Sequence, residues 1–114
     1  MLAALTDRRS ELVARAVRDL LADCLVTLPA LLERNATASL DFWFSNFDGM
    51  RRALDPQLAE ARPPGTAQVD TGRLAREAAR GRQQWHARAV ELLARWRAGG
   101  ADALVAACQT AGAA

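Results

Sequence analysis

The stretch Asp41-Phe42-Trp43-Phe44-Ser45-Asn46-Phe47 holds four of the six aromatic residues in this chain of 114 residues. An α-helix turns by about 100° per residue, so three adjacent rings cannot all face one core. Trp43 and Phe47, four residues apart, can share a buried face. Phe42 and Phe44 then flank that face, and we expect at least one of them to meet something other than this chain's own core.

The same apolar face extends beyond the aromatic stretch in both directions. Its spacing of three or four residues is that of an amphipathic helix. We therefore expect one helix that runs through Gly49, despite a cost of about 1 kcal/mol for an interior glycine. It should end at Asp55-Pro56, because the residue before a proline is disfavoured in the α conformation. The face consists of Leu28, Leu32, Ala36, Leu40, Trp43, Phe47, Met50 and Leu54.

Upstream, a wide apolar stripe predicts a helix that begins near Thr6 or Asp7, since either residue can cap it. Pro29 interrupts this pattern, but the flanking residues 25–32 include no loop formers. A chain reversal there would expose a very apolar turn to water. The sequence therefore favours a first arm of about residues 7–54 that is kinked at Pro29, with Thr27 able to cap its second part. The stripe comprises Leu12, Val13, Ala16, Val17, Leu20, Leu21, Cys24, Leu25 and Leu28.

Downstream, residues 55–72 form the connector, which contains the turn-forming run Pro63-Pro64-Gly65. Asp70 or Thr71 is expected to cap a second arm of about residues 73–98. Small residues in the first half of this arm would let another helix approach closely. Gly99-Gly100 should stop the arm or bend it sharply, followed by a short last helix of about residues 101–109. The apolar positions of the arm are Leu74, Ala78, Gly81, Trp85, Ala89, Leu92 or Leu93, and Trp96.

These segments predict a single all-α domain over residues 1–114, built as a long helical hairpin plus a short C-terminal helix. The composition agrees, because isoleucine and tyrosine are absent and good helix formers dominate. A straight first arm would be roughly 70 Å long. Two such arms cannot bury stripes this wide against each other alone. A homodimer that completes a helical bundle would cover the remainder.

Composition and targeting signals indicate a cytoplasmic, bacterial protein. All fifteen basic residues are arginine, and lysine, isoleucine and tyrosine, whose codons are AT-rich, are missing together. A GC-rich bacterial genome explains this better than a functional preference for guanidinium groups. The N-terminus lacks the order of a signal peptide, and no apolar run approaches the roughly 20 residues of a membrane span.

The sequence holds no pattern typical of catalysis, of a metal site or of a cofactor site. His86 has no carboxylate three or four residues away, and Cys24 and Cys108 are expected to be reduced and buried. One histidine and two distant cysteines make no zinc pattern, and the glycines form no phosphate-binding loop. We therefore expect a protein that is not an enzyme and has no cofactor.

Two groups of residues remain as candidates for binding. The aromatic cluster could be the core of a homodimer, the site for a different protein, or a surface for lipid or an apolar granule. An arginine stripe on the second arm could be a solvated face, or could contact an acidic protein or nucleic acid. The predicted partner-binding residues are Leu40, Phe42, Trp43, Phe44, Phe47 and Met50, and the predicted rim residues are Arg73, Arg76, Arg80, Arg88 and Arg95.

The function that these features favour is a small regulatory or adaptor protein that acts by protein–protein binding. Concrete forms are an antiactivator that sequesters a transcription regulator and a secretion-type chaperone that holds a client. One alternative is an amphipathic, granule-associated coat protein. A second is a nucleic-acid accessory protein, although the aromatic residues are not interleaved with the arginines and nucleic acid is the less favoured partner.

Overall fold

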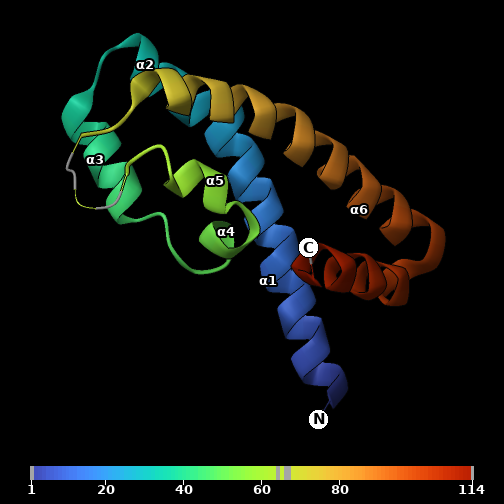
Figure 1. Cartoon of the computed structure of the whole chain (residues 1–114). Coiled ribbons are helices and arrows are strands. Elements are labelled where there is room, and N and C mark those ends of the chain that lie inside the picture. Colours follow the sequence, from blue (N-terminus) through green and yellow to red (C-terminus); the bar gives the residue numbers. More distant parts are fainter. Residues whose placement is uncertain (1, 64, 66–67, 114) are drawn as a thin grey trace.

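Pro29 is accommodated within continuous helical structure, because a π-helical turn precedes it. In this computed structural model, α1 (Leu2–Ala22), the π-helix η1 (Asp23–Thr27) and α2 (Leu28–Glu33) follow one another directly (Figure 1). A proline ring clashes with the carbonyl one turn earlier and offers no N–H. In the wider turn, Leu28 donates its N–H to the carbonyl of Asp23, five residues back. The distortion therefore lies one turn before Pro29, and Thr27 makes no side-chain cap.

The structure describes the backbone of residues 2–63, 65 and 68–113, and the side chains of residues 8–63, 65, 68–95 and 97. Throughout these residues it is all-helical and contains no strand, which confirms the predicted fold class. Helix α1 starts at Leu2, so the predicted start near Thr6 or Asp7 was wrong. The side chains of those two residues lie outside the described ones.

The helix predicted from Leu28 to Leu54 is broken first at Asn35, which has a positive φ of 53°. Asn35 donates its N–H to the carbonyl of Leu32, and Ala36 donates to that of Leu31. This pair of bonds closes the end of a helix around one left-handed residue, a conformation that asparagine tolerates better than most residues. The chain then starts again as α3 (Thr37–Ser45).

A second break separates α3 from α4 (Gly49–Leu54). The side chain of Asn46 donates to the carbonyl of Phe42, and the hydroxyl of Ser45 donates to that of Asp41, so both side chains bond to the last turn of α3. Gly49 has a φ of 58° and thus starts a helix instead of lying inside one. The expectation of a helix running through Gly49 was wrong for this reason.

The predicted end at Asp55-Pro56 is confirmed. Helix α4 ends at Leu54, and a single turn, α5 (Pro56–Ala59), begins at the proline. The carboxylate of Asp55 caps this turn by accepting the N–H of Leu58. The described residues between α5 and α6 contain no helix, and the N–H of Asp70 reaches the carbonyl of Ala61 at 2.8 Å.

The long helix α6 (Thr71–Ala113) forms the second half of the chain. Asp70 caps it as predicted, with its carboxylate accepting the N–H of Arg73 at 3.0 Å. The helix continues through Gly99 and Gly100, so no separate helix begins near residue 101. Figure 1 shows that α6 nevertheless bends sharply and that its C-terminal part turns back, which is the other outcome predicted for the glycine pair.

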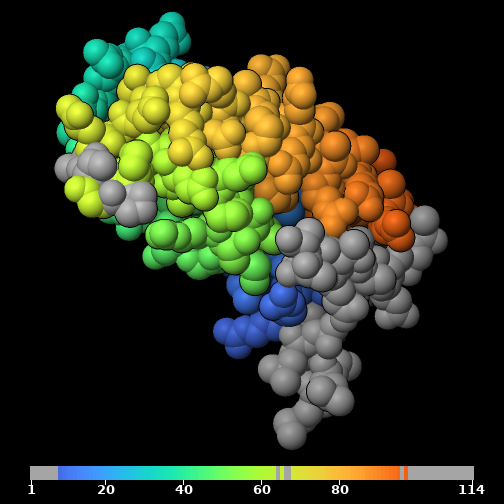
Figure 2. Space-filling model, in the orientation of Figure 1, coloured from blue at the N-terminus to red at the C-terminus, as the bar shows by residue number. Residues whose placement is uncertain are grey.

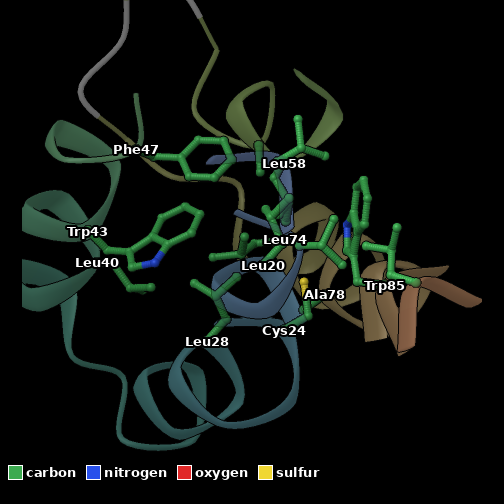
Figure 3. Packing of buried hydrophobic residues seen from close by; sticks show 14 residues of the cluster. Leu20, Cys24, Leu28, Leu40, Trp43, Phe47, Leu58, Leu74, Ala78 and Trp85 are labelled. Carbon is green, nitrogen blue, oxygen red and sulfur yellow. The ribbon is translucent and has the colours of Figure 1, made fainter. Parts of the chain in front are cut away.

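The core lies where α1, η1 and α2 pass between two groups of elements. Helix α6 covers one side, and α3, α4 and α5 gather on the other (Figure 1). Leu20, Cys24 and Leu28 lie between the aromatic rings of the α3 region and the inner face of α6 (Figure 3). In the space-filling view, the green helices after α2 and the yellow start of α6 form one continuous surface (Figure 2). The molecule measures 43 × 25 × 19 Å, so it has no straight arm of roughly 70 Å.

Gly81 allows α6 to approach η1 closely. A Cβ atom at this position would lie 2.5 Å from Sγ of Cys24, closer than real carbon–sulfur contacts permit. Gly81 and Cys24 are both buried. Small residues in the first half of the second arm were predicted to let another helix approach closely. The helical element that approaches at Gly81 is η1 of the same chain.

We predict that Gly81→Ala destabilises the protein by about 1–3 kcal/mol, although alanine favours helix by about 1 kcal/mol. The physical reason is the overlap with Cys24. Urea denaturation followed by circular dichroism measures the change. In a Cys24→Ala background the same substitution should cost less, because the sulfur has been removed.

Gly72→Ala is the matched control, since its Cβ would meet only Arg76 Nη1 at 3.6 Å and Asp70 Oδ1 at 3.7 Å. That substitution should leave stability unchanged or raise it by up to about 1 kcal/mol. Equal effects of the two substitutions, or no coupling between positions 81 and 24, would contradict the proposed role of the close approach.

Candidate functional site

The aromatic cluster is divided between the core and the surface. Trp43 and Phe47 are buried, and their rings stack with centroids 4.7 Å apart and planes 19° apart. Leu40 is buried beside them, and Met50 is half-buried against the same cluster. The prediction that Trp43 and Phe47 belong to the core is confirmed. Figure 3 shows Phe47 extending toward Leu58 of α5.

Phe42 and Phe44 have different surroundings. Phe44 is half-buried and meets Trp43 edge to face, with ring centroids 4.9 Å apart. Phe42 is 72% exposed, and no described side chain stacks on its ring. Of the six residues predicted to bind a partner, Phe42 thus offers by far the most free apolar surface.

Arg51 fixes α3 and α4 against η1. Its Nη1 lies 2.8 Å from Oδ2 of Asp23, and its Nη2 donates to the carbonyl of Asn46 at 2.7 Å. The guanidinium also lies over the ring of Phe47, 5.4 Å from the centroid. This one side chain therefore joins η1, through Asp23 28 residues away in the sequence, to the C-terminal end of α3 and to its own helix α4.

The environment of Asp23 raises the pKa of its carboxyl above the ordinary value of 3.8. Burial is the main cause, and the hydrogen bond and charge of Arg51 only partly oppose it. The indole of Trp43 faces the same carboxylate and also lowers its pKa, although Trp43 Nε1 lies outside hydrogen-bonding geometry. A carboxylate in a largely apolar setting is thus held by one cation.

A second polar cluster, centred on Asp55, was missed by the sequence analysis. Asp55 is 2% exposed, and its carboxylate accepts hydrogen bonds from Arg80 Nη1 at 3.0 Å and Arg80 Nη2 at 2.8 Å. Trp85 Nε1 donates to it at 2.7 Å, and the N–H of Leu58 donates at 3.3 Å. Four donors therefore satisfy one buried carboxylate, which joins the α4–α5 junction to α6.

Arg80 is the cation of this cluster. Burial lowers its pKa, but the hydrogen bonds and charges of Asp55 and Glu77 outweigh that effect and raise it. Glu77 Oε2 lies 3.0 Å from Arg80 Nη2, and Gln84 accepts from Nη1 at 2.7 Å. Arg80 is therefore a structural residue, not a free rim contact.

The predicted arginine stripe is largely paired within the chain. Arg73 lies 2.7 Å from Glu60, and Arg88 lies 2.8 Å from Glu91. Arg95 shares Glu91 at 3.7 Å. Arg76 is exposed and has no ion pair with any described carboxylate. Together with Arg80, three of the five predicted rim residues thus hold short ion pairs that an external partner would have to break.

Among the described residues, two pockets lie between helices. The first, which we call the arginine pocket, has a volume of about 400 Å³ and lies where α3, α4, α5 and the connector meet. Its lining comprises Phe44, Ser45, Phe47, Arg52, Ala59, Arg62, Pro63 and Gly65. The second is a groove of about 510 Å³ between η1, α2 and α6. Its lining comprises Cys24, Pro29, Leu32, Ala75, Ala78, Ala79, Arg82 and Gln83.

The described side chains give no indication of metal or thiol chemistry. They contain no group of three or more histidine, cysteine or acidic residues that could hold a metal ion. Burial raises the pKa of the Cys24 thiol to about 12, with a further contribution from the charge of Asp55, so this thiol is a poor nucleophile. His86 is exposed. Cys108 lies outside the described side chains. No helix among the described residues has the length and apolarity needed to cross a membrane.

Comparison with known proteins identifies a family but not an activity. A family model described as "Family of unknown function (DUF6866) C-terminal domain" matches residues 1–113, and the chain therefore belongs to that family. No curated protein and no solved structure is significantly similar to it. The site must therefore be interpreted from its own geometry.

We predict that Asp55→Asn lowers the free energy of unfolding by about 3 kcal/mol or more, the scale for removing one partner of a buried ion pair. The amide would place its own donors against Arg80 and Trp85. Thermal and urea denaturation measure the loss. Asp48→Asn, at an exposed acidic residue that has no ion pair with any described side chain, should stay within about 0.5 kcal/mol of wild type. A change at Asp55 no larger than that at Asp48 would show that the cluster does not stabilise the fold.

The raised pKa of Asp23 predicts a pH dependence with a definite sign. The folded state binds this proton more tightly than the unfolded state does. The resulting stabilisation is fully present below pH 3.8, the unfolded value, and is lost as pH rises through the folded pKa. Asp23→Asn has no carboxyl that titrates at this position. Its free energy of unfolding relative to the wild type should therefore increase as pH rises from 3.8 through the folded pKa.

Urea denaturation of both proteins at constant ionic strength provides the measurement. NMR titration of the Asp23 carboxyl gives an independent reading, and Arg51→Gln should raise the pKa further because it removes the opposing charge. A carboxyl that titrates below 3.8 in the wild type would contradict this account.

Proposed function

We propose that this chain is a small regulatory or adaptor protein that acts by binding another protein, with Phe42 as its main anchor. The observation that carries the proposal is the 72% exposure of the Phe42 ring on a helix whose neighbouring aromatic residues are buried. Phenylalanine and tryptophan are typical anchors of protein interfaces, where one ring enters a partner's apolar pocket. An antiactivator or a secretion-type chaperone would use such an anchor.

The packing of α3 supports this role. The stacked pair of Trp43 and Phe47 fixes one face of the helix, and Arg51 holds its C-terminal end through the carbonyl of Asn46. A preorganised anchor loses little conformational entropy on binding, which favours affinity. The exposed ring of Phe42 is thus presented by a helix that packing already holds in place.

We further propose that a second copy of the chain completes a helical bundle. Val26 is 62% exposed on η1 and Val90 is 54% exposed on α6, and Leu25 and Leu93 are exposed near them in sequence. A homodimer that buries them would account for apolar surface that the single chain leaves in water.

Binding of nucleic acid receives less support. Phosphate recognition needs several available cations, and the ion pairs of Arg73, Arg80 and Arg88 engage most of the stripe.

The family description refers to a C-terminal domain, so another domain of the same polypeptide is one form that the bound partner could take. We propose binding, not catalysis, as the activity in each case.

The decisive experiment compares Phe42→Ala with wild type in stability and in binding. Because the ring is exposed, the free energy of unfolding should change by less than about 0.5 kcal/mol. Proteins that co-purify with the tagged wild-type chain should be depleted at least tenfold, the effect expected of an anchor residue worth about 2 kcal/mol. Leu12→Ala, another exposed apolar residue on a different helix, is the matched control and should retain them.

Sedimentation equilibrium separates the two parts of the proposal. Val26→Asp with Val90→Asp should convert a dimer to a monomer, whereas Phe42→Ala should leave the dimer intact. An unchanged co-purification profile for Phe42→Ala would refute the anchor, and a monomeric wild type would refute the dimer.

A further inference from the structure

The arginine pocket presents two cations that no carboxylate among the described side chains neutralises. Arg52, at the C-terminal end of α4, and Arg62, just after α5, both line it. Neither forms an ion pair with any carboxylate of the described side chains, in contrast to the adjacent Arg51, which is paired with Asp23. The pocket therefore concentrates positive charge beside the rings of Phe44 and Phe47.

Arg62 is the more informative of the two, because it is half-buried. A guanidinium has five N–H donors, and among the described residues the side chain of Arg62 makes a single hydrogen bond, a long one of 3.4 Å from Nη1 to the carbonyl of Asp41. A partly desolvated cation with unused donors is costly unless an anion or water satisfies it. Its remaining donors are available to a ligand in the pocket.

We propose that the arginine pocket binds a small phosphate monoester whose apolar or ring portion lies against Phe44. Guanidinium groups bind phosphate oxygens through paired hydrogen bonds, and Arg52 and Arg62 supply two such groups from separate segments. Ser45 also lines the pocket, but its hydroxyl donates to the carbonyl of Asp41, so the two guanidinium groups supply the donors for the phosphate. The volume of about 400 Å³ lies within the range of small-molecule sites.

This site is distinct from the proposed protein-binding anchor. Phe42 does not line the pocket, and its neighbour Phe44 does. Residues two apart on a helix point in directions about 200° apart, so one helix can serve both surfaces. The two proposals can therefore fail independently.

The test is an NMR titration of the full-length chain, labelled with nitrogen-15, at constant ionic strength. The probes are phenyl phosphate, inorganic phosphate and phenol. Phenyl phosphate should shift the amide signals of Ser45, Ala59 and Gly65 in a saturable manner. Inorganic phosphate should shift the same signals with lower affinity, and phenol should bind more weakly than phenyl phosphate.

Substitutions of the two arginines test whether their charges bind the phosphate group. Arg62→Ala and Arg52→Ala should each weaken phenyl phosphate binding about tenfold, as expected for a lost charge-assisted contact. Arg62→Lys should recover only part of the loss, because lysine keeps the charge without the planar fork. Arg34→Ala, at an exposed arginine outside the pocket, and Phe42→Ala should both bind as wild type does.

Three results would overturn the proposal. One is the absence of saturable shifts at millimolar phenyl phosphate. Another is an equal loss of affinity in Arg34→Ala, which would indicate non-specific attraction to arginine. The third is phenol binding as tightly as phenyl phosphate. If Arg62→Ala does not fold, as circular dichroism would reveal, Arg62→Lys and Arg52→Ala provide the same test.

Discussion

The burial of the Asp55 carboxylate is the constraint on which the arrangement of the second half of the chain depends. A carboxylate with only 2% of its surface exposed is tolerated because Arg80, Trp85 and the backbone of Leu58 supply four donors. Three of these four donors belong to two residues of α6, and the acceptor lies between α4 and α5, so the cluster ties α6 to that junction. Replacing a buried ion pair by apolar residues can be neutral for stability, whereas separating its members is costly. The cluster therefore acts mainly by penalising alternative placements of α6, while the apolar core supplies most of the favourable energy.

The sequence predicted the buried face of the chain better than it predicted the helices that carry this face. Each of the eight residues of the predicted apolar face, from Leu28 to Leu54, is buried or half-buried, as expected. However, this face does not lie on one straight helix, because Asn35 adopts a left-handed conformation and Gly49 starts a new helix. Periodicity reports which residues face the core, and short helices wrapped around that core preserve the same spacing as one long helix. The signals for the breaks were single residues, an asparagine and a glycine, that are also tolerated inside helices at modest cost.

In the candidate site too, some features could be predicted from the sequence and others could not. Helical geometry was sufficient to separate Trp43 and Phe47 from Phe42, since it depends only on the angle between successive residues. The fate of the arginines could not be inferred in this way. Whether Arg80 is free depends on Asp55, 25 residues away, which the sequence marks only as a residue before a proline. Which charges pair over long distances depends on the tertiary fold. The spacing of residues in a single sequence does not show these pairs.

Adjacent residues of one type can therefore take opposite roles, and this links the core to both proposed surfaces. Arg51 and Arg52 follow each other in α4, about 100° apart around the helix axis. Arg51 lies over Phe47 and pairs with Asp23, so it stabilises the core. Arg52 faces the arginine pocket without a carboxylate partner. Phe42 and Trp43 divide in the same manner between solvent and core. In both pairs the member that packs inward, buried Trp43 or half-buried Arg51, fixes the helix that presents the exposed member. Loss of Arg51 or Trp43 should therefore impair binding indirectly through stability, whereas loss of Arg52 or Phe42 should impair it directly. Only variants of the second kind can identify what the protein binds.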